Sequence, residues 1–365
     1  MSDLKRSRPA APVRAVHMGL GSFFRAHQAW YTHHAPDAAA WGIAAFTGRS
    51  ARMADLLSAQ DALYLLDVRA PEGDRIELIE SLSAVHAAGD LGAWLGYWRD
   101  PQVCLVTLTV TEAGYRRTAG GGLDLLSEDV QHDLAALRSR DYTALRTAPG
   151  QLVAGFIARR AADAGPITIV PCDNLPGNGP ALAAVIDELA RMVDPTLATW
   201  SAANVEFAST AVDRITPATS DDDRSRIEAA TGLVDRSPVI TEPFSEWIIS
   251  GAFSAGRPQW QEVGALFVPD TSPYEARKLT LLNGSHSLMA YAGPLRGHTT
   301  VSEAIADDTV RGWVDQWWDE ACAHLPLPAD TLAGYRAALL ERYANPGIQH
   351  RLAQIAMDGS LKLPI

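Results

Sequence analysis

Short apolar runs alternate with amphipathic, helix-like segments along roughly the first 210 residues of the chain. The runs predicted to be strands are 13–18, 41–46, 64–68, 76–85, 103–110, 167–171 and 205–212. The segments predicted to be helices are 24–34, 51–59, 91–98, 151–164 and 179–192, the second with Ser50 as its N-cap. Strands that alternate with helices in this way predict an open, mostly parallel sheet of the α/β class.

From Pro243 onward the long periodic segments indicate helices instead. The predicted helices are 275–290, 309–323, 329–343 and 348–357, and the Gly- and Pro-rich stretch 256–274 is expected to be a loop or short strand. We therefore predict a sheet domain at residues 1–244, followed by a mainly α-helical domain at residues 245–365.

Composition and charge narrow the function classes. The chain has 365 residues, a net charge of −12 and a pI near 5.3, which argues against nucleic acid and anionic membranes as partners. No apolar run approaches the roughly 20 residues of a membrane helix, and residues 1–12 lack the apolar core of a signal peptide. Three widely spaced cysteines, and histidines without ligand spacing, predict neither a disulfide framework nor a metal site. We expect a cytoplasmic monomer or homodimer that acts on a small molecule.

Three polar side chains with complementary chemistry interrupt the apolar helix predicted at 275–290. An ideal helix turns 100° per residue, which puts His286 about 80° and Asn283 about 140° round from Lys278. All three can point into one cleft. An amine, an amide and an imidazole are what hydride transfer at a secondary alcohol needs, namely a base, a donor to the oxygen and a group that positions the substrate.

Lys278 is the candidate base, and it must lose its charge by burial or beside a positive nicotinamide ring. Glu275 lies one turn back, where a direct ion pair would raise the lysine pKa and oppose a neutral base, whereas a role in passing protons to solvent is compatible. The alternative for this pair is a solvated surface couple. The alternatives for Asn283 and His286 are a helix-to-loop hydrogen bond and a satisfied core residue.

A second polar stretch, 171–179, follows the strand predicted at 167–171. It therefore lies at the carboxyl edge of the sheet, where open α/β sheets bind ligands. Asn174 is the candidate second amide of an oxyanion hole. Asp173 and Asn178 are interpreted as turn formers, and Cys172 as a small buried residue.

Gly19 and Gly21 lie between the first predicted strand and the first predicted helix, the context of a dinucleotide-binding turn. Phe24 replaces the third glycine of the usual fingerprint, so a purely structural turn is the alternative. Phe23 and Arg25 are further candidate cofactor residues, and a surface arginine is the alternative for Arg25.

The end of the second strand, 47–50, has no acidic residue to bind the ribose 2′-hydroxyl of NAD. Arg49 lies there instead. Taken alone this favours NADP, although an arginine that lies flat against the adenine suits either cofactor.

Several motifs together resemble the mannitol dehydrogenase family of long-chain polyol and hexuronate dehydrogenases. They are 17–27, 109–115, 172–179, 242–247, 278–286 and 358–362, and the specific one is lysine, four residues, asparagine, two residues, histidine. The resemblance implies a Rossmann-type N-terminal domain, a mainly helical C-terminal domain and metal-independent hydride transfer between them. It also implies NAD as cofactor, which outweighs the preference for NADP.

The resemblance further implies roles for individual residues. Lys278 is expected to be the base, Asn174 and Asn283 the oxyanion hole, and Glu275 a gate on a proton path. His286 and Lys362 are expected near the substrate. Two departures are the second phenylalanine in 23–27 and Gln354, where polyol-acting members tend to have arginine. The helical domain is also expected to be shorter than in relatives.

The stretch 354–360 looks more like the fructuronate reductase branch, so Gln354 is counted among the substrate-binding candidates. We expect an NAD-dependent enzyme that interconverts a secondary alcohol and a ketone on a sugar acid or polyol, with mannonate/fructuronate favoured over mannitol/fructose. The alternative is a non-catalytic nucleotide-binding or sensor protein that keeps the fold.

Overall fold

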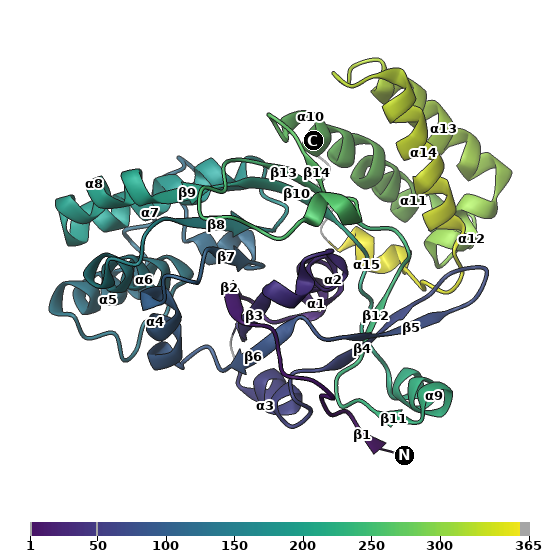
Figure 1. Ribbon diagram of the computed structural model, residues 1–365. Helices are drawn as coiled ribbons and strands as arrows, with labels where there is room; N and C mark the ends of the chain where they lie inside the picture. The colour runs from purple at the N-terminus through teal and green to yellow at the C-terminus, as the bar shows by residue number, and fades with distance from the viewer. Residues whose placement is uncertain (1, 49, 358–365) are drawn as a thin grey trace.

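The computed structural model describes residues 2–48 and 50–357, and it places a sheet domain beside a helical domain (Figure 1). The largest sheet has six strands in the order β6-β3-β2-β7-β8-β9, and all neighbours in it are parallel. These strands are β2 (Val13–Met18), β3 (Gly42–Phe46), β6 (Leu82–His86), β7 (Leu105–Leu108), β8 (Ile167–Pro171) and β9 (Val205–Phe207). The predicted α/β class is confirmed.

Helices cover both faces of this sheet, which explains why its central strands are mostly apolar. Val16 and Val106 point into a core shared with the helices at the left of Figure 1, whereas Ala15 and Leu105 point into the core on the opposite face. The helices of this domain are α1 (Ser22–Ala26), α2 (Gln28–His34), α3 (Arg52–Ser58), α4 (Leu91–Arg99), α5 (Glu128–Ser139), α6 (Ala148–Ala162), α7 (Asn178–Val193), α8 (Pro195–Asn204) and α9 (Asp221–Thr231).

Smaller sheets extend the domain. β4 (Tyr64–Val68) lies between β5 (Arg75–Ile79) and β12 (Val239–Thr241), and the short β1 (Ser2–Asp3) pairs with β11 (Leu233–Val234). β10 (Ser209–Asp213), β13 (Glu246–Ser250) and β14 (Leu266–Phe267) form another sheet. Strand pairing with β10 therefore continues past residue 244, the predicted end of the sheet domain.

Four local predictions for the sheet domain differ from the structure. The helix predicted at 24–34 is broken at His27, whose φ and ψ of −119° and −92° are not helical. The predicted strands 76–85 and 205–212 each divide into two strands that belong to different sheets. Ser50 is not the N-cap of α3, because that position is Ala51 and no side chain caps this helix.

The helical domain has its own apolar core, which includes Leu281, Met289, Val314 and Leu339. Its helices are α10 (Ser272–Arg277), a π-helix (Lys278–Asn283), α11 (Gly284–Leu295), α12 (Val301–Ala306), α13 (Asp308–Cys322), α14 (Ala329–Ala344) and α15 (Leu352–Ala356). The sequence pattern did not predict α12, and it made α15 too long because 348–351 is irregular. Within the described residues, none of the helices is both long and apolar enough to span a bilayer.

Candidate active site

Lys278 begins the π-helix and faces the sheet domain. Its Nζ donates to Oδ1 of Asn174, at 2.6 Å, and to the carbonyl oxygen of Val212 in β10, at 2.7 Å. Burial lowers the pKa of Lys278, although the negative charge of Asp213 opposes the shift. The lysine is therefore held by two neutral acceptors in an environment that disfavours its charge.

The π-helix changes how the polar residues line up. Its hydrogen bonds join residues five apart, so Lys278 and Asn283 lie about one turn from each other rather than the 140° apart of an ideal α-helix. Both residues line one cavity of about 270 Å³ together with Asn174. Local π-turns of this kind are frequent at functional sites.

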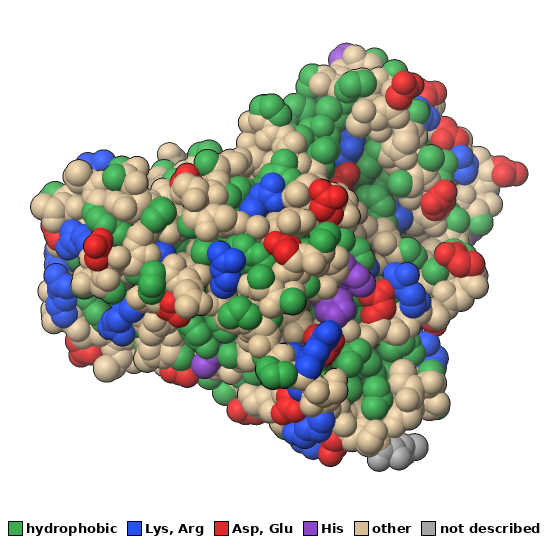
Figure 2. All heavy atoms as spheres, in the orientation of Figure 1, with side chains coloured by type: hydrophobic (Ala, Val, Ile, Leu, Met, Phe, Trp, Pro, Cys, Tyr) green, Lys and Arg blue, Asp and Glu red, His purple; other side chains and the backbone are tan. Residues whose placement is uncertain are grey.

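This cavity lies where the helical domain meets the carboxyl edge of the sheet domain. Figure 2 shows the surface hollowed between the two domains, with apolar side chains at the upper right lining the hollow. The residues that line the cavity come from the loop after β8, from β10 and from α10 with the π-helix. They are Asp173, Asn174, Leu175, Pro176, Thr210, Ala211, Val212, Ser272, Glu275, Ala276, Lys278, Leu279 and Asn283.

The loop that carries Asn174 is held by its neighbours on both sides. Asp173 accepts from the hydroxyl of the fully buried Tyr115 and, at 2.9 Å, from the backbone N–H of Leu175. Asn178 makes two hydrogen bonds with the backbone of Thr210. Asp173 lies in the turn, as predicted, but Asn178 is the first residue of α7 rather than a turn former, and its buried side chain ties the start of that helix to β10. The role of Tyr115 was not predicted, although this residue ends the motif 109–115, one of those that resemble the mannitol dehydrogenase family.

The contact with Lys278 sets the orientation of the Asn174 amide. An amine nitrogen in this contact donates, so the atom it meets is the amide oxygen, and the amide N–H₂ remains available as a donor. Asn174 is exposed to the cavity, and Asn283 is half-buried beside it. Two of the predicted amides and the predicted base thus lie together.

Glu275 lines the same cavity but does not pair with Lys278 in the described part of the chain. Its carboxylate accepts from the Thr271 hydroxyl at 2.7 Å and from the backbone N–H of Gly177 at 3.2 Å. The ion pair considered from the sequence is therefore absent among the described residues. A role in proton passage stays a prediction.

The remaining predicted substrate residues are placed less directly. His286 is nearly buried in α11, with its ring 4.9 Å from the ring of Tyr343 and 5.0 Å from that of His350. Gln354 is exposed on α15. Neither lines the 270 Å³ cavity. Lys362 lies outside the described residues, and all three assignments stay predictions.

A buried charge cluster that sequence reasoning missed lies next to the cavity. Arg342 of α14 forms paired hydrogen bonds with Asp213 at the end of β10, at 2.7 and 3.1 Å, and with Glu242, at 2.8 and 2.9 Å. Burial lowers the pKa of Arg342, but the two carboxylates outweigh it and raise the pKa well above the ordinary value. Glu242 lies in a recognised motif, but nothing in the sequence pairs it with an arginine 100 residues away.

The glycine turn lies at the carboxyl end of β2, as predicted. Gly19 has a φ of +112°, and a Cβ there would lie 2.7 Å from Oγ1 of Thr109 in the loop after β7. Gly21 directly precedes α1, and Phe23 stacks on His27 at 5.0 Å. A side chain at Gly19 would therefore collide with the loop after β7, so the tight turn at this edge requires glycine.

Arg25 does not lie on the surface, which was the alternative considered from the sequence. Its guanidinium is buried and donates to the Ser237 carbonyl at 2.5 Å, to the Ser237 hydroxyl at 3.2 Å and to the Gly21 carbonyl at 3.3 Å. These contacts favour a structural role, and a phosphate contact stays a prediction. Arg49 lies outside the described residues.

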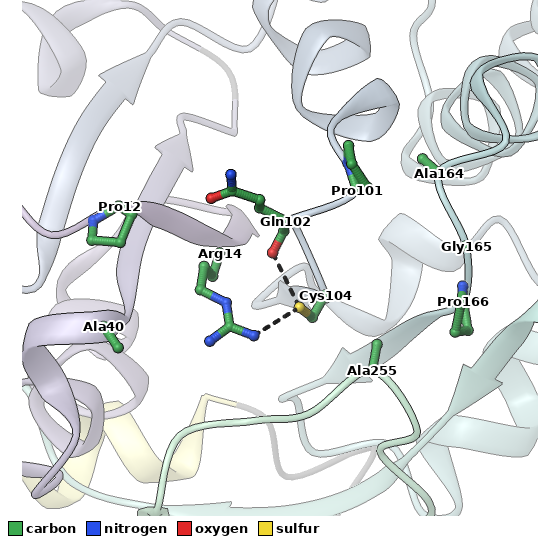
Figure 3. Close-up of a pocket in the computed structure, with 10 residues that line it drawn as sticks. All are labelled: Pro12, Arg14, Ala40, Pro101, Gln102, Cys104, Ala164, Gly165, Pro166 and Ala255. Atoms are coloured by element: carbon green, nitrogen blue, oxygen red, sulfur yellow. Dashed lines mark hydrogen bonds between the residues drawn. The ribbon is translucent and has the colours of Figure 1, made fainter.

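A second, wider cavity of about 640 Å³ lies at the opposite, amino edge of the sheet (Figure 3). Its polar side chains include Arg14, which stacks on Trp41 at 4.1 Å and donates to the Cys104 thiol at 3.4 Å. None of the predicted site residues lines it. Because open parallel sheets bind ligands at their carboxyl edge, the smaller cavity beside Lys278 is the candidate active site.

The described residues contain no group of three or more His, Cys, Asp or Glu side chains that could hold a metal ion. The donors that do converge beside the sheet are one amine and two amides. The fold joins a Rossmann-type parallel-sheet domain to a mainly helical domain, and these donors lie where the two meet.

Comparison with known proteins identifies the family. Residues 13–262 match the family model of the mannitol dehydrogenase Rossmann domain, and residues 270–365 match that of the mannitol dehydrogenase C-terminal domain. The chain belongs to the mannitol dehydrogenase family. The first matched region extends to residue 262 and therefore includes β13, the strand that pairs with β10.

Named relatives include enzymes for different substrates. The chain is 38% identical to D-mannonate oxidoreductase of Escherichia coli (strain K12), over 100% of this chain and 77% of the relative. It is 40% identical to D-arabinitol 4-dehydrogenase of Ralstonia nicotianae, over 99% of this chain and 78% of the relative. Among solved structures, the Pseudomonas fluorescens mannitol 2-dehydrogenase ternary complex with NAD and D-mannitol is 32% identical. That match has a TM-score of 0.87 and covers 100% of this chain and 75% of the other.

Proposed function

We propose that this protein is an NAD-dependent, metal-independent oxidoreductase that interconverts a secondary alcohol and a ketone on an acyclic sugar acid or polyol. The observation that carries the proposal is the position of Lys278. Its desolvated amine lies between Asn174 and Val212, at the same carboxyl edge of the sheet as the glycine turn. The structural relative solved with NAD and D-mannitol supports the same cofactor and a related substrate.

Lys278 is proposed as the general base in alcohol oxidation. A neutral amine has two N–H groups and one lone pair. The two observed acceptors use both N–H groups, which leaves the lone pair to take the hydroxyl proton of the substrate. In ketone reduction the same group, as an ammonium, returns the proton. Oxidation therefore rises with pH through the pKa of Lys278, and reduction falls.

Asn174 and Asn283 are proposed to hold the reacting oxygen. The N–H₂ group of Asn174 faces the cavity because its oxygen is bound to Lys278, and the π-turn brings Asn283 to the same wall. Amide donors stabilise negative charge that develops on an alkoxide without competing for its proton. Glu275, which also lines the cavity, is proposed to pass the proton onward to solvent.

The cofactor is proposed to bind at the carboxyl edge through the turn of Gly19 and Gly21, with its phosphates near the start of α1. When bound, the nicotinamide accepts or supplies the hydride. The protein's part is to orient it, and the close packing of Gly19 on Thr109 fits a turn shaped for a pyrophosphate.

Among possible substrates we favour the D-mannonate/D-fructuronate pair over mannitol/fructose. The support is the similarity to D-mannonate oxidoreductase and the presence of Gln354 in place of the arginine expected in polyol-acting members. Because the sequence identity to D-arabinitol 4-dehydrogenase is comparable, polyol-type substrates must be tested as well. A panel of keto-uronates and ketoses, assayed with both NADH and NADPH at the nicotinamide absorbance, identifies substrate and cofactor.

The decisive variant is Lys278→Ala. We expect turnover to fall by about 10²–10⁴-fold, the usual contribution of a positioned acid–base group, while NADH binding survives. Lys5→Ala is the matched control, because Lys5 is exposed and pairs with Asp61 far from the cavity. A Lys278→Ala enzyme with unchanged turnover would reject the base. A wild-type protein that binds NADH but oxidises it with no member of the panel would instead support the non-catalytic alternative.

A further inference from the structure

A buried histidine that the proposed reaction does not use lies directly beneath the glycine turn. His17 is in β2, two residues before Gly19, and its side chain is 0% exposed. Its Nδ1 lies 2.8 Å from Oγ1 of Thr107 in β7, and its Nε2 lies 3.1 Å from Oγ1 of Thr109. Burial lowers the pKa of His17 to about 3, so the ring is neutral at physiological pH.

The hydrogen bonds around the ring run in one direction only. The Thr109 hydroxyl donates to the carbonyl oxygen of Gly19 at 2.8 Å, since a carbonyl cannot donate. Its single proton is then used, and it can only accept from His17. Nε2 of His17 must therefore carry the ring proton, and Nδ1 must accept from the Thr107 hydroxyl.

The same ring explains how the turn tolerates Phe24. The third glycine of a dinucleotide fingerprint normally lets helix and strand pack closely. Here the ring of Phe24 lies flat on the ring of His17, with centroids 3.4 Å apart and planes 6° apart. This stacked pair joins α1 to β2 where a glycine would otherwise allow direct contact.

We propose that His17 and Thr109 are positioning residues for the cofactor. They act through a chain of hydrogen bonds that begins at the Thr107 hydroxyl, passes through the His17 ring and the Thr109 hydroxyl, and ends at the Gly19 carbonyl. The inference rests on the proposed NAD-dependent function. The backbone N–H of Gly19 is bound to the Phe46 carbonyl at 3.0 Å, so with its carbonyl bound to Thr109 the glycine is held on both sides. The turn to which the proposed function assigns the cofactor phosphates is thereby fixed at its first glycine.

Thr109→Val tests the chain, because valine keeps the shape of threonine but cannot donate to Gly19. We expect the Kd for NADH, measured by calorimetric titration, to rise about ten-fold, the effect of losing one such hydrogen bond. At saturating NADH, kcat and the KM for the sugar substrate should stay near wild type. Thr109→Ser restores the donor and should restore the affinity.

Thr241→Val is the matched control for a purely structural effect. Thr241 is also buried, and its hydroxyl also donates to a backbone carbonyl, that of Ile215 at 3.0 Å, which is not part of the turn. We expect a similar loss of thermal stability and an unchanged Kd for NADH. Equal weakening of NADH binding in both valine variants, or none in Thr109→Val, would overturn the positioning role.

A second measurement reads the state of the His17 ring in the wild-type protein, where the turn is undisturbed. In protein with ¹⁵N-labelled histidine, the His17 signals, assigned by their loss in His17→Gln, should show a neutral ring protonated at Nε2 from about pH 5 to 9. A proton on Nδ1, or a charged ring, would contradict the chain. If the wild-type protein itself fails to bind NADH, the proposed function fails, and the positioning role with it.

Discussion

Two basic side chains, Lys278 and Arg342, lie beside Asp213, and their surroundings shift their pKa values in opposite directions. The pKa of Lys278 is lowered, and that of Arg342 is raised. Lys278 donates to an amide and a backbone carbonyl, whereas Arg342 is paired with two carboxylates. Neutral acceptors do not repay the cost of desolvating a charge, and paired carboxylates do.

The difference separates a group that exchanges a proton from one that holds the structure. Arg342 lies in α14 of the helical domain, and its partners Asp213 and Glu242 belong to the sheet domain. It therefore helps to hold the π-helix against β10, where Lys278 meets Val212. The permanent charge pair supports the geometry in which the other cation can become neutral.

The largest effect is expected from removing the permanent cation. Arg342→Met leaves two carboxylates buried without their partner, and breaking such a pair costs about 3–5 kcal/mol of unfolding free energy. Chemical denaturation with urea measures it. Arg336→Met, on the same helix, removes a pair with the exposed Asp319 and should cost about 0–1 kcal/mol. Equal losses in the two variants would contradict the distinction between buried and surface pairs.

A negative charge placed beside Lys278 should stabilise its ammonium form, as the two carboxylates stabilise the charged form of Arg342. In Asn174→Asp the acceptor of the lysine becomes a carboxylate, which favours the ammonium and raises the lysine pKa by about 1–2 units. The pH dependence of alcohol oxidation should therefore shift to higher pH by the same amount. Asn204→Asp is the control, because the Asn204 side chain donates to the backbone carbonyl of Trp200 within α8 and does not line the cavity. If the pH dependence of alcohol oxidation did not shift in Asn174→Asp, Lys278 would not be the group that determines it.

The smallest effect is expected from Glu275→Gln. Because the carboxylate is bound to Thr271 and Gly177 rather than to Lys278, the apparent pKa of oxidation should change by less than about 0.5 unit. A role in proton passage predicts a several-fold slower kcat that added small buffers restore. A shift of a full unit in the pH profile would instead show direct charge coupling to the lysine.

The fold was largely predictable because its signals are local. Strands such as β3 and β8 are buried over their whole length and mostly apolar, since helices cover both faces of the sheet, and this pattern is visible in the chain itself. The predictions that were wrong involve backbone geometry. The break at His27 and the absence of a cap at Ser50 depend on contacts that a pattern of residue types does not record.

The kinds of chemistry at the site were also present in the sequence, because an amine and two amides keep their functional groups in any environment. Lys278, Asn174 and Asn283 could be named from spacing and from their places beside predicted elements. Their family resemblance strengthened the choice. What these residues do with a proton was not determined at that level.

The sequence by itself thus determined the class of fold, the family and the functional groups on offer. Only the tertiary structure decided that the π-turn aligns Asn283 with Lys278, that Arg25 is buried, and that Arg342 takes up Asp213 and Glu242. The reason is physical. A side chain's identity is local, but its pKa and its exposure are set by groups that folding brings from distant positions in the chain.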